Sequence, residues 1–173
     1  MTDTDKTLLL TIARNSIKES FGLMYTPVDA SHLNQIAGSF VTLKIGESLR
    51  GCIGYLIGLK PLYQQIYELA KEAAFEDPRF PPLHRSEYAH LSVEISVLTP
   101  PQRIKTLDEF VLSQDGIILT VGKNRAVFLP QVADEMGWNK GQMLSALSRK
   151  AGLDSQAYKR ADAVFETFQA EVF

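Results

Sequence analysis

The sequence predicts an α+β protein in which antiparallel strand pairing dominates. The chain has 173 residues, of which 45% are hydrophobic, and this is enough apolar material for one sizeable core. Apolar residues recur at helical spacing in some segments and alternate in others, so both helices and strands are expected. The segments follow one another in a mixed order with two hairpins and no regular strand–helix–strand repeat, which favours antiparallel sheets.

The first half of the chain predicts two helices and a hairpin. A stripe of apolar residues at helical spacing predicts a helix over residues 5–21. Residues 39–45 and 49–56 are typical of two strands joined by a short turn, and so predict a hairpin. The next helix should end near Asp77, because Pro78 disfavours helical geometry in the residue before it.

A third strand and a second hairpin follow. A strand over residues 92–98 places its branched apolar residues on one face and Glu94 and Ser96 on the opposite face. Residues 117–121 and 125–129 have the strand pattern again and flank a short polar turn, so they predict another antiparallel pair.

The last part of the chain predicts two helices and a strand. A short helix should stop at Gly137. Asn139 and Gln142 have the spacing of a capping box at the start of a further helix, which Gly152 closes. The tail, residues 164–173, is rich in β-branched and aromatic residues and is predicted as a strand, although its apolar residues also fit one face of a helix.

Composition and charge argue against several classes of protein. The net charge is −2, without the basic excess that nucleic-acid binding requires, and no Lys or Arg cluster suggests an anionic membrane surface. No apolar run approaches the ~20 residues that span a bilayer, and the polar N-terminus does not resemble a signal peptide. Because Cys52 is the only cysteine, no disulfide can form within the chain. We therefore expect a cytoplasmic protein with neither nucleic-acid nor membrane partners.

The most informative segment is LRGCIG, residues 49–54. In a strand Arg50 and Cys52 would share a face, and a nearby guanidinium favours the thiolate, the reactive form of cysteine. Gly51 and Gly54 are poor strand formers, and one reason for them is the close approach of a ligand or another backbone. The alternatives are that Cys52 is a small buried apolar residue and that a glycine marks a bulge.

Two further positions are candidates for the same site. The prolines of FEDPRFPPL, residues 75–83, restrict the backbone around Arg79 and could hold its side chain toward an anionic ligand. Glu94 becomes a candidate acid or base if its strand face meets that of Cys52. The alternatives are a helix stop with a stiff linker and a solvated strand face. The three histidines are scattered and Cys52 has no second cysteine nearby, so no metal site is predicted.

These motifs together resemble the AMMECR domain family, including the prokaryotic members called AmmeMemoRadiSam system protein A. The resemblance runs from about Gly38 to the C-terminus, and the first helix also fits. LRGCIG is followed in order by FEDPRFPPL, VEISVLTPP, DGI, LPQV and RKAGL.

The resemblance implies a single AMMECR-type domain over residues 1–173 with antiparallel sheets and flanking helices. A larger lobe would come from both chain ends and a smaller lobe would be inserted between them. The LRGCIG segment would line a cleft, and Asp77, Arg79 and Glu94 match the family pattern. Many relatives have a cysteine where this chain has Ser148, so a mechanism that needs a second thiol there is not supported.

For function, the resemblance implies an association with a Memo-like protein and a radical S-adenosylmethionine protein; it identifies no cofactor. Three hypotheses follow for the LRGCIG segment. The chain is a cysteine-centred enzyme or accessory component, with Cys52 as nucleophile, Arg50 beside it and Glu94 handling protons. Alternatively, the segment and Arg79 form a docking surface for a protein partner. In the third hypothesis Gly51 and Gly54 serve only tight packing.

Overall fold

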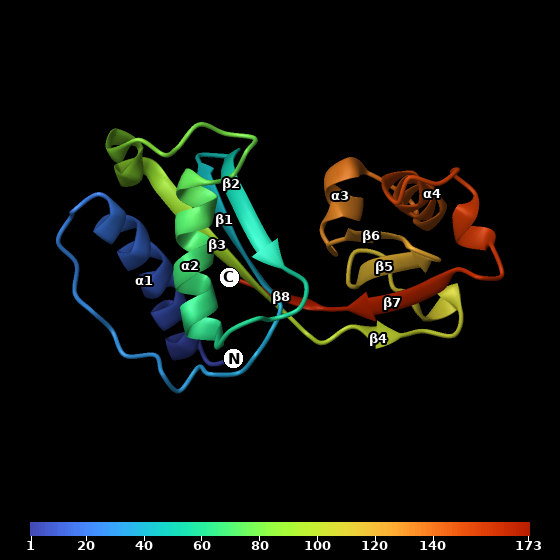
Figure 1. Cartoon of the computed structure of the whole chain (residues 1–173), viewed down its shortest axis with the longest axis horizontal. Helices are drawn as coiled ribbons and strands as arrows, with labels where there is room; N and C mark the ends of the chain where they lie inside the picture. Colours follow the sequence, from blue (N-terminus) through green and yellow to red (C-terminus); the bar gives the residue numbers. More distant parts are fainter. The chain divides into compact units, whose positions relative to one another are not determined.

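Two four-stranded antiparallel sheets organise the chain, and the computed structural model describes all 173 residues (Figure 1). The chain divides into two units. Unit 1 comprises Met1–Leu98 and Glu171–Phe173, and unit 2 comprises Thr99–Ala170. The α+β class and the dominance of antiparallel pairing are confirmed.

Unit 1 contains a sheet with strand order β2-β1-β3-β8 and two long helices. Strand β8 comes from the end of the chain and joins β3 through a pair of backbone hydrogen bonds between Ile95 and Phe173. The elements are α1 (Asp3–Ser20), β1 (Ser39–Ile45), β2 (Ser48–Tyr55), α2 (Leu62–Phe75), the 3₁₀ helix η1 (Arg85–His90), β3 (Leu91–Leu98) and β8 (Ala170–Val172).

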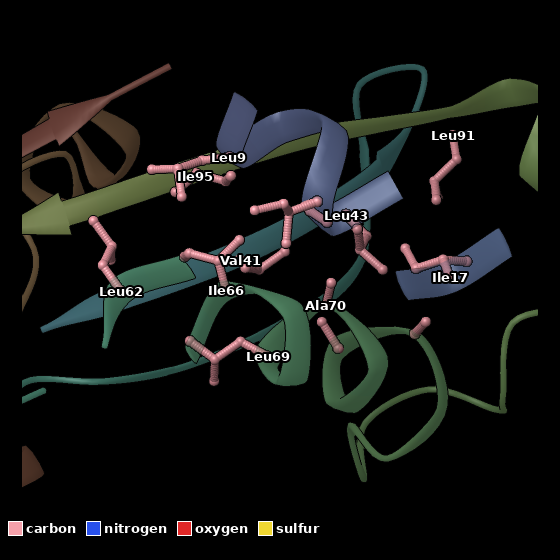
Figure 2. Packing of buried hydrophobic residues seen from close by; sticks show 14 of the residues in the cluster. Leu9, Ile17, Val41, Leu43, Leu62, Ile66, Leu69, Ala70, Leu91 and Ile95 are labelled. Carbon is pink, nitrogen blue, oxygen red and sulfur yellow. The ribbon is translucent and has the colours of Figure 1, made fainter. Parts of the chain in front are cut away.

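The core of unit 1 lies between the helices and one face of this sheet. Figure 2 shows leucine and isoleucine side chains of α1 and α2 packed against Val41 and Leu43 of β1. Each fully buried side chain of this size contributes about 1.5–3 kcal/mol relative to an exposed one. Since successive side chains of a strand point to opposite faces, Thr42 and Lys44 lie on the outer face, away from the helices.

Unit 2 contains a sheet with strand order β4-β7-β5-β6. Its core joins Ile117 and Leu119 of β5 to Met143 and Leu147 of α4. The elements are β4 (Gln102–Arg103), the 3₁₀ helix η2 (Leu107–Glu109), β5 (Gly116–Val121), β6 (Asn124–Phe128), α3 (Val132–Met136), α4 (Lys140–Lys150), the 3₁₀ helix η3 (Ala157–Lys159) and β7 (Val164–Phe168).

Both predicted hairpins and the capping box of α4 are confirmed. The side chain of Asn139 accepts the backbone N–H of Gln142, and the Gln142 side chain accepts the backbone N–H of Asn139, each at 2.9 Å. The predicted single strand over residues 164–173 is wrong in one respect. It is two strands, β7 and β8, which pair in different sheets. None of the helices combines the length and the apolar character needed to cross a bilayer.

Candidate functional site

The backbone of Cys52 is held from the free side of an edge strand. Strand β2 has a neighbour on one side only, so the outward N–H and C=O groups of Cys52 have no strand partner. A carboxylate oxygen of Asp77 accepts the Cys52 N–H at 2.9 Å, and Nη2 of Arg79 donates to the Cys52 carbonyl oxygen at 3.1 Å. The connector after α2 therefore supplies the two hydrogen bonds that a neighbouring strand would otherwise make with the backbone of Cys52.

Asp77 and Arg79 form a tight ion pair beneath this contact. The Asp77 side chain is only 2% exposed, and its two oxygens accept from Nε and Nη2 of Arg79 at 3.0 and 2.8 Å. The guanidinium of Arg79 holds the pKa of Asp77 well below its ordinary value, and the Cys52 N–H acts in the same direction against the effect of burial. Hence the carboxylate is charged at every physiological pH, and its buried charge is fully hydrogen-bonded.

The thiol of Cys52 lies on the outer face of the sheet. Strand register places Cys52 opposite Thr42, and Thr42 opposite Glu94, so the three side chains form a row across β2, β1 and β3. The Sγ atom of Cys52 lies 3.2 Å from the Thr42 hydroxyl. Because adjacent strands are about 4.8 Å apart, the backbones of Glu94 and Cys52 lie roughly 10 Å apart, and no hydrogen bond joins the two side chains. The Glu94 carboxylate instead accepts a hydrogen bond from Lys44 at 3.2 Å.

Arg50 makes its polar contacts with the 81–87 segment and none with Cys52. A β-bulge leaves Arg50 without a partner in β1. Its Nε and Nη2 donate to the Glu87 carboxylate at 2.9 and 3.0 Å, and Nη1 donates to the Pro81 carbonyl at 2.9 Å. This guanidinium, with the backbone N–H of His84, lowers the pKa of Glu87 to about 2. The pair ties β2 to the start of η1.

The two glycines of the motif admit close neighbours. A Cβ atom on Gly51 would collide with the backbone carbonyl of Ala73 in α2, and one on Gly54 would collide with the ring of Phe40. A glycine in a strand is often a place where another group approaches closely. At Gly51 this group is the backbone of α2, and at Gly54 it is an aromatic ring. Since Gly51 faces α2, its neighbour Cys52 faces outward.

The sequence predicts Arg50, Cys52, Asp77, Arg79 and Glu94 as site residues but does not point to three residues that contact them. Thr42 carried a usable signal, because it alternates with the buried Val41 and Leu43. Lys44 carried the same signal. Glu87 had only its capping-box spacing to His84, which does not reveal its pairing with Arg50 across 37 sequence positions. No group of three or more His, Cys, Asp or Glu side chains in the chain is arranged to hold a metal ion.

Comparison with known proteins places the chain in a family. The AMMECR1 family model matches residues 10–173. A protein of Methanothermobacter thermautotrophicus is 39% identical over 145 residues, which cover 80% of this chain and 76% of the relative. Protein SSO0193 of Saccharolobus solfataricus is 38% identical over 180 aligned positions, covering 96% of this chain and 79% of the relative. The crystal structure of the uncharacterized protein PH0010 from Pyrococcus horikoshii superposes with a TM-score of 0.87 at 33% identity, covering 99% of this chain and 92% of the other. The chain therefore belongs to the AMMECR1 family.

Proposed function

We propose that Cys52 is the working group of a thiol site on the outer face of the unit 1 sheet, in a cysteine-centred enzyme or accessory protein. One observation carries this proposal. Asp77 and Arg79 fix both backbone polar groups of Cys52, while its half-buried thiol has only the Thr42 hydroxyl as a polar partner. These contacts fix the backbone of Cys52 and therefore the direction in which its thiol leaves the sheet.

The surrounding residues have separate roles in this proposal. Cys52 is the nucleophile or ligand-contacting thiol, and the Thr42 hydroxyl orients it at 3.2 Å. No hydrogen bond joins Glu94 to the thiol, so in this proposal Glu94 exchanges protons with a ligand bound over Thr42, and Lys44 donates to its carboxylate at 3.2 Å. Arg79 has Nη1 to offer an anionic part of the ligand, because its polar contacts to the protein use the other nitrogens.

The remaining motif residues support the site indirectly. Arg50 anchors β2 through Glu87, and Asp77 holds both Arg79 and the Cys52 peptide. Gly51 permits close packing against α2 on the inner face of the sheet, and Gly54 makes room for the ring of Phe40. We propose further that the chain acts together with a Memo-like protein and a radical S-adenosylmethionine protein on a small molecule or macromolecule. The support for these two partners is the family resemblance of the motifs.

The thiol is tested first by alkylation with iodoacetamide, which is unambiguous because Cys52 is the only cysteine. The native chain should react at least as fast as the urea-unfolded chain, and Thr42→Val should change the native rate without changing the unfolded rate. Arg50→Ala should leave the native rate nearly unchanged, since Arg50 contacts Glu87 rather than the thiol. A native reaction far slower than the unfolded one at every pH would identify a buried, inert thiol and end the proposal.

The catalytic step is tested by reconstitution with the two proposed partners. Turnover of S-adenosylmethionine or modification of a substrate should be lost in Cys52→Ser and reduced in Glu94→Gln. Lys123→Gln, an exposed change in unit 2, serves as the control. Full turnover by Cys52→Ser would rule out nucleophilic catalysis by this residue.

A second candidate function is a non-catalytic docking module for a protein partner. It is favoured by the exposed apolar side chains at and beyond the end of β2: Tyr55 is 39% exposed, Ile57 58% and Leu59 64%. Ile57→Asp and Leu59→Asp should then abolish capture of the Memo-like protein, while Cys52→Ser should leave it intact. Capture that survives both aspartate variants, or that fails in Cys52→Ser alone, contradicts docking at this surface.

A further inference from the structure

A groove of about 540 Å³ in unit 2 combines cations and aromatic rings and has no carboxylate in its lining. It follows one side of α4 and reaches η3, so it is remote in sequence from the LRGCIG motif. Its volume lies within the range of small-molecule sites, about 300–1,000 Å³. The residues that give it its chemistry are Trp138, Gln142, Arg149, Gln156, Tyr158 and Lys159.

The two cations of the groove have no acidic partner within the protein. Neither Arg149 nor Lys159 takes part in an ion pair, and both are exposed. The adjacent residue, Lys150, behaves differently, because its ammonium donates to the Val127 carbonyl at 2.8 Å and lies over the Phe128 ring. Positive charge in the last turn of α4 favours the helix dipole. Arg149 presents, in addition, a guanidinium fork suited to a carboxylate or phosphate.

Aromatic and amide groups complete the lining. Trp138 and Tyr158 contribute rings, and the ammonium of Lys159 lies 5.5 Å from the centre of the Tyr158 ring. Gln156 contributes an amide group that can donate or accept hydrogen bonds, and Gln142, whose oxygen accepts the Asn139 N–H, contributes its amide NH₂ as a donor. Cations suit an anionic group, rings suit a flat unsaturated one, and amides suit the polar edge of a heterocycle.

We propose that this groove binds a small phosphorylated ligand with a flat ring, the class to which nucleoside monophosphates belong. The phosphate lies between Arg149 and Lys159, and the ring stacks on Trp138 or Tyr158. The site needs no glycine-rich phosphate loop and is independent of the thiol chemistry proposed for Cys52.

Trp138 is the only tryptophan of the chain, so its fluorescence reports on this groove directly. The full-length protein is titrated at constant ionic strength with adenosine 5′-monophosphate, inorganic phosphate and adenosine. The nucleotide should produce a saturable change and bind more tightly than either fragment. Arg149→Gln and Lys159→Gln should each weaken it roughly tenfold, as expected for the loss of a charged hydrogen bond. Tyr158→Leu should also weaken it, and Lys123→Gln, which removes an exposed cation outside the groove, should not.

Three results would overturn the proposal. The first is the absence of a saturable response to the nucleotide. The second is equal weakening by Lys123→Gln and Arg149→Gln, which would show a general effect of charge rather than a site. The third is that inorganic phosphate or adenosine alone matches the affinity of the nucleotide, which would remove the ring or the phosphate from the recognition. Thermal unfolding of each variant confirms that it is folded, as expected for exposed side chains.

Discussion

The carboxylate of Asp77 accepts the backbone N–H of Cys52 at 2.9 Å, across 25 positions of sequence. This hydrogen bond joins the connector after α2 to the edge of the unit 1 sheet at the one cysteine of the chain. An unpaired strand edge is a hazard for aggregation, and native proteins cover or interrupt such edges. Here the edge is covered by the Asp77–Arg79 ion pair, which hydrogen-bonds to the backbone of the residue whose thiol faces outward.

Replacing Asp77 by Asn should destabilise the fold by about 1.5–3 kcal/mol. The amide oxygen can still accept the Cys52 N–H, but the buried side chain loses its charge pairing with Arg79. Urea unfolding measures the difference. The neighbouring exposed carboxylate offers a matched control, since Glu76→Gln should change stability by less than about 0.5 kcal/mol. Equal stability of the two variants would mean that the Asp77 contact adds nothing to the fold.

Because of the Arg50–Glu87 pair, part of the free energy of unfolding should depend on pH in the acid range. Because the pKa of Glu87 falls from 4.5 to about 2 on folding, the unfolded chain binds the proton more readily between these values. The stabilisation is therefore complete above about pH 4.5 and is lost as the pH falls toward 2. Unfolding free energies measured through this range should decline less steeply in Glu87→Gln than in the parent protein.

The exposed turn residue Glu47 supplies the control for this pH dependence. Glu47→Gln should show the same acid profile as the parent chain. If Glu87→Gln also retains the parent profile, the acid sensitivity of the fold comes from other carboxylates and the ion pair has no role in it.

The local elements of the fold were predictable because their signals are local. The alternation of Val41, Thr42 and Leu43 marks a strand with one buried face, and Asn139 with Gln142 marks a helix start. The alternation of apolar and polar residues does not show which strands pair with one another. Strand β3 pairs with β1 although β2, α2 and η1 lie between them in the sequence. The tail, whose pattern predicts a single strand, forms two strands in different sheets.

The candidate site shows the same division. The motif identifies Cys52 and its glycines allow a bulge, but they do not reveal that the Arg50 side chain binds Glu87, 37 positions away in the sequence. The sequence predicts that a helix ends near Asp77, because a following proline is a strong local signal. The role of Asp77 as acceptor of the Cys52 N–H depends on a contact that only the folded chain creates.

Ser148 in α4 should contribute to the stability of unit 2 through two hydrogen bonds. Its hydroxyl is fully buried, donates to the Leu144 carbonyl at 2.9 Å and accepts the Tyr158 N–H at 3.1 Å. Ser148→Ala leaves that N–H without an acceptor and should cost about 1–3 kcal/mol. Ser148→Cys should cost less, because sulfur is still a weak acceptor. The control is Ser145→Ala on the same helix; an equal effect of the two alanine variants would exclude this role.

Gly51→Ala should lower the stability of unit 1 by about 3 kcal/mol, the upper end for an overpacked site. The added methyl group would meet the backbone carbonyl of Ala73 in the last turn of α2, and a backbone atom cannot move aside as the end of a flexible side chain can. Thermal and urea unfolding measure the loss. Gly141→Ala is the matched control: its methyl group would lie 3.6 Å from the nearest atom, Oδ1 of Asn139, so it should be neutral or stabilising by up to about 1 kcal/mol. A Gly51→Ala protein as stable as the parent, yet altered in Cys52 alkylation, would show that Gly51 serves the thiol site rather than the packing of α2.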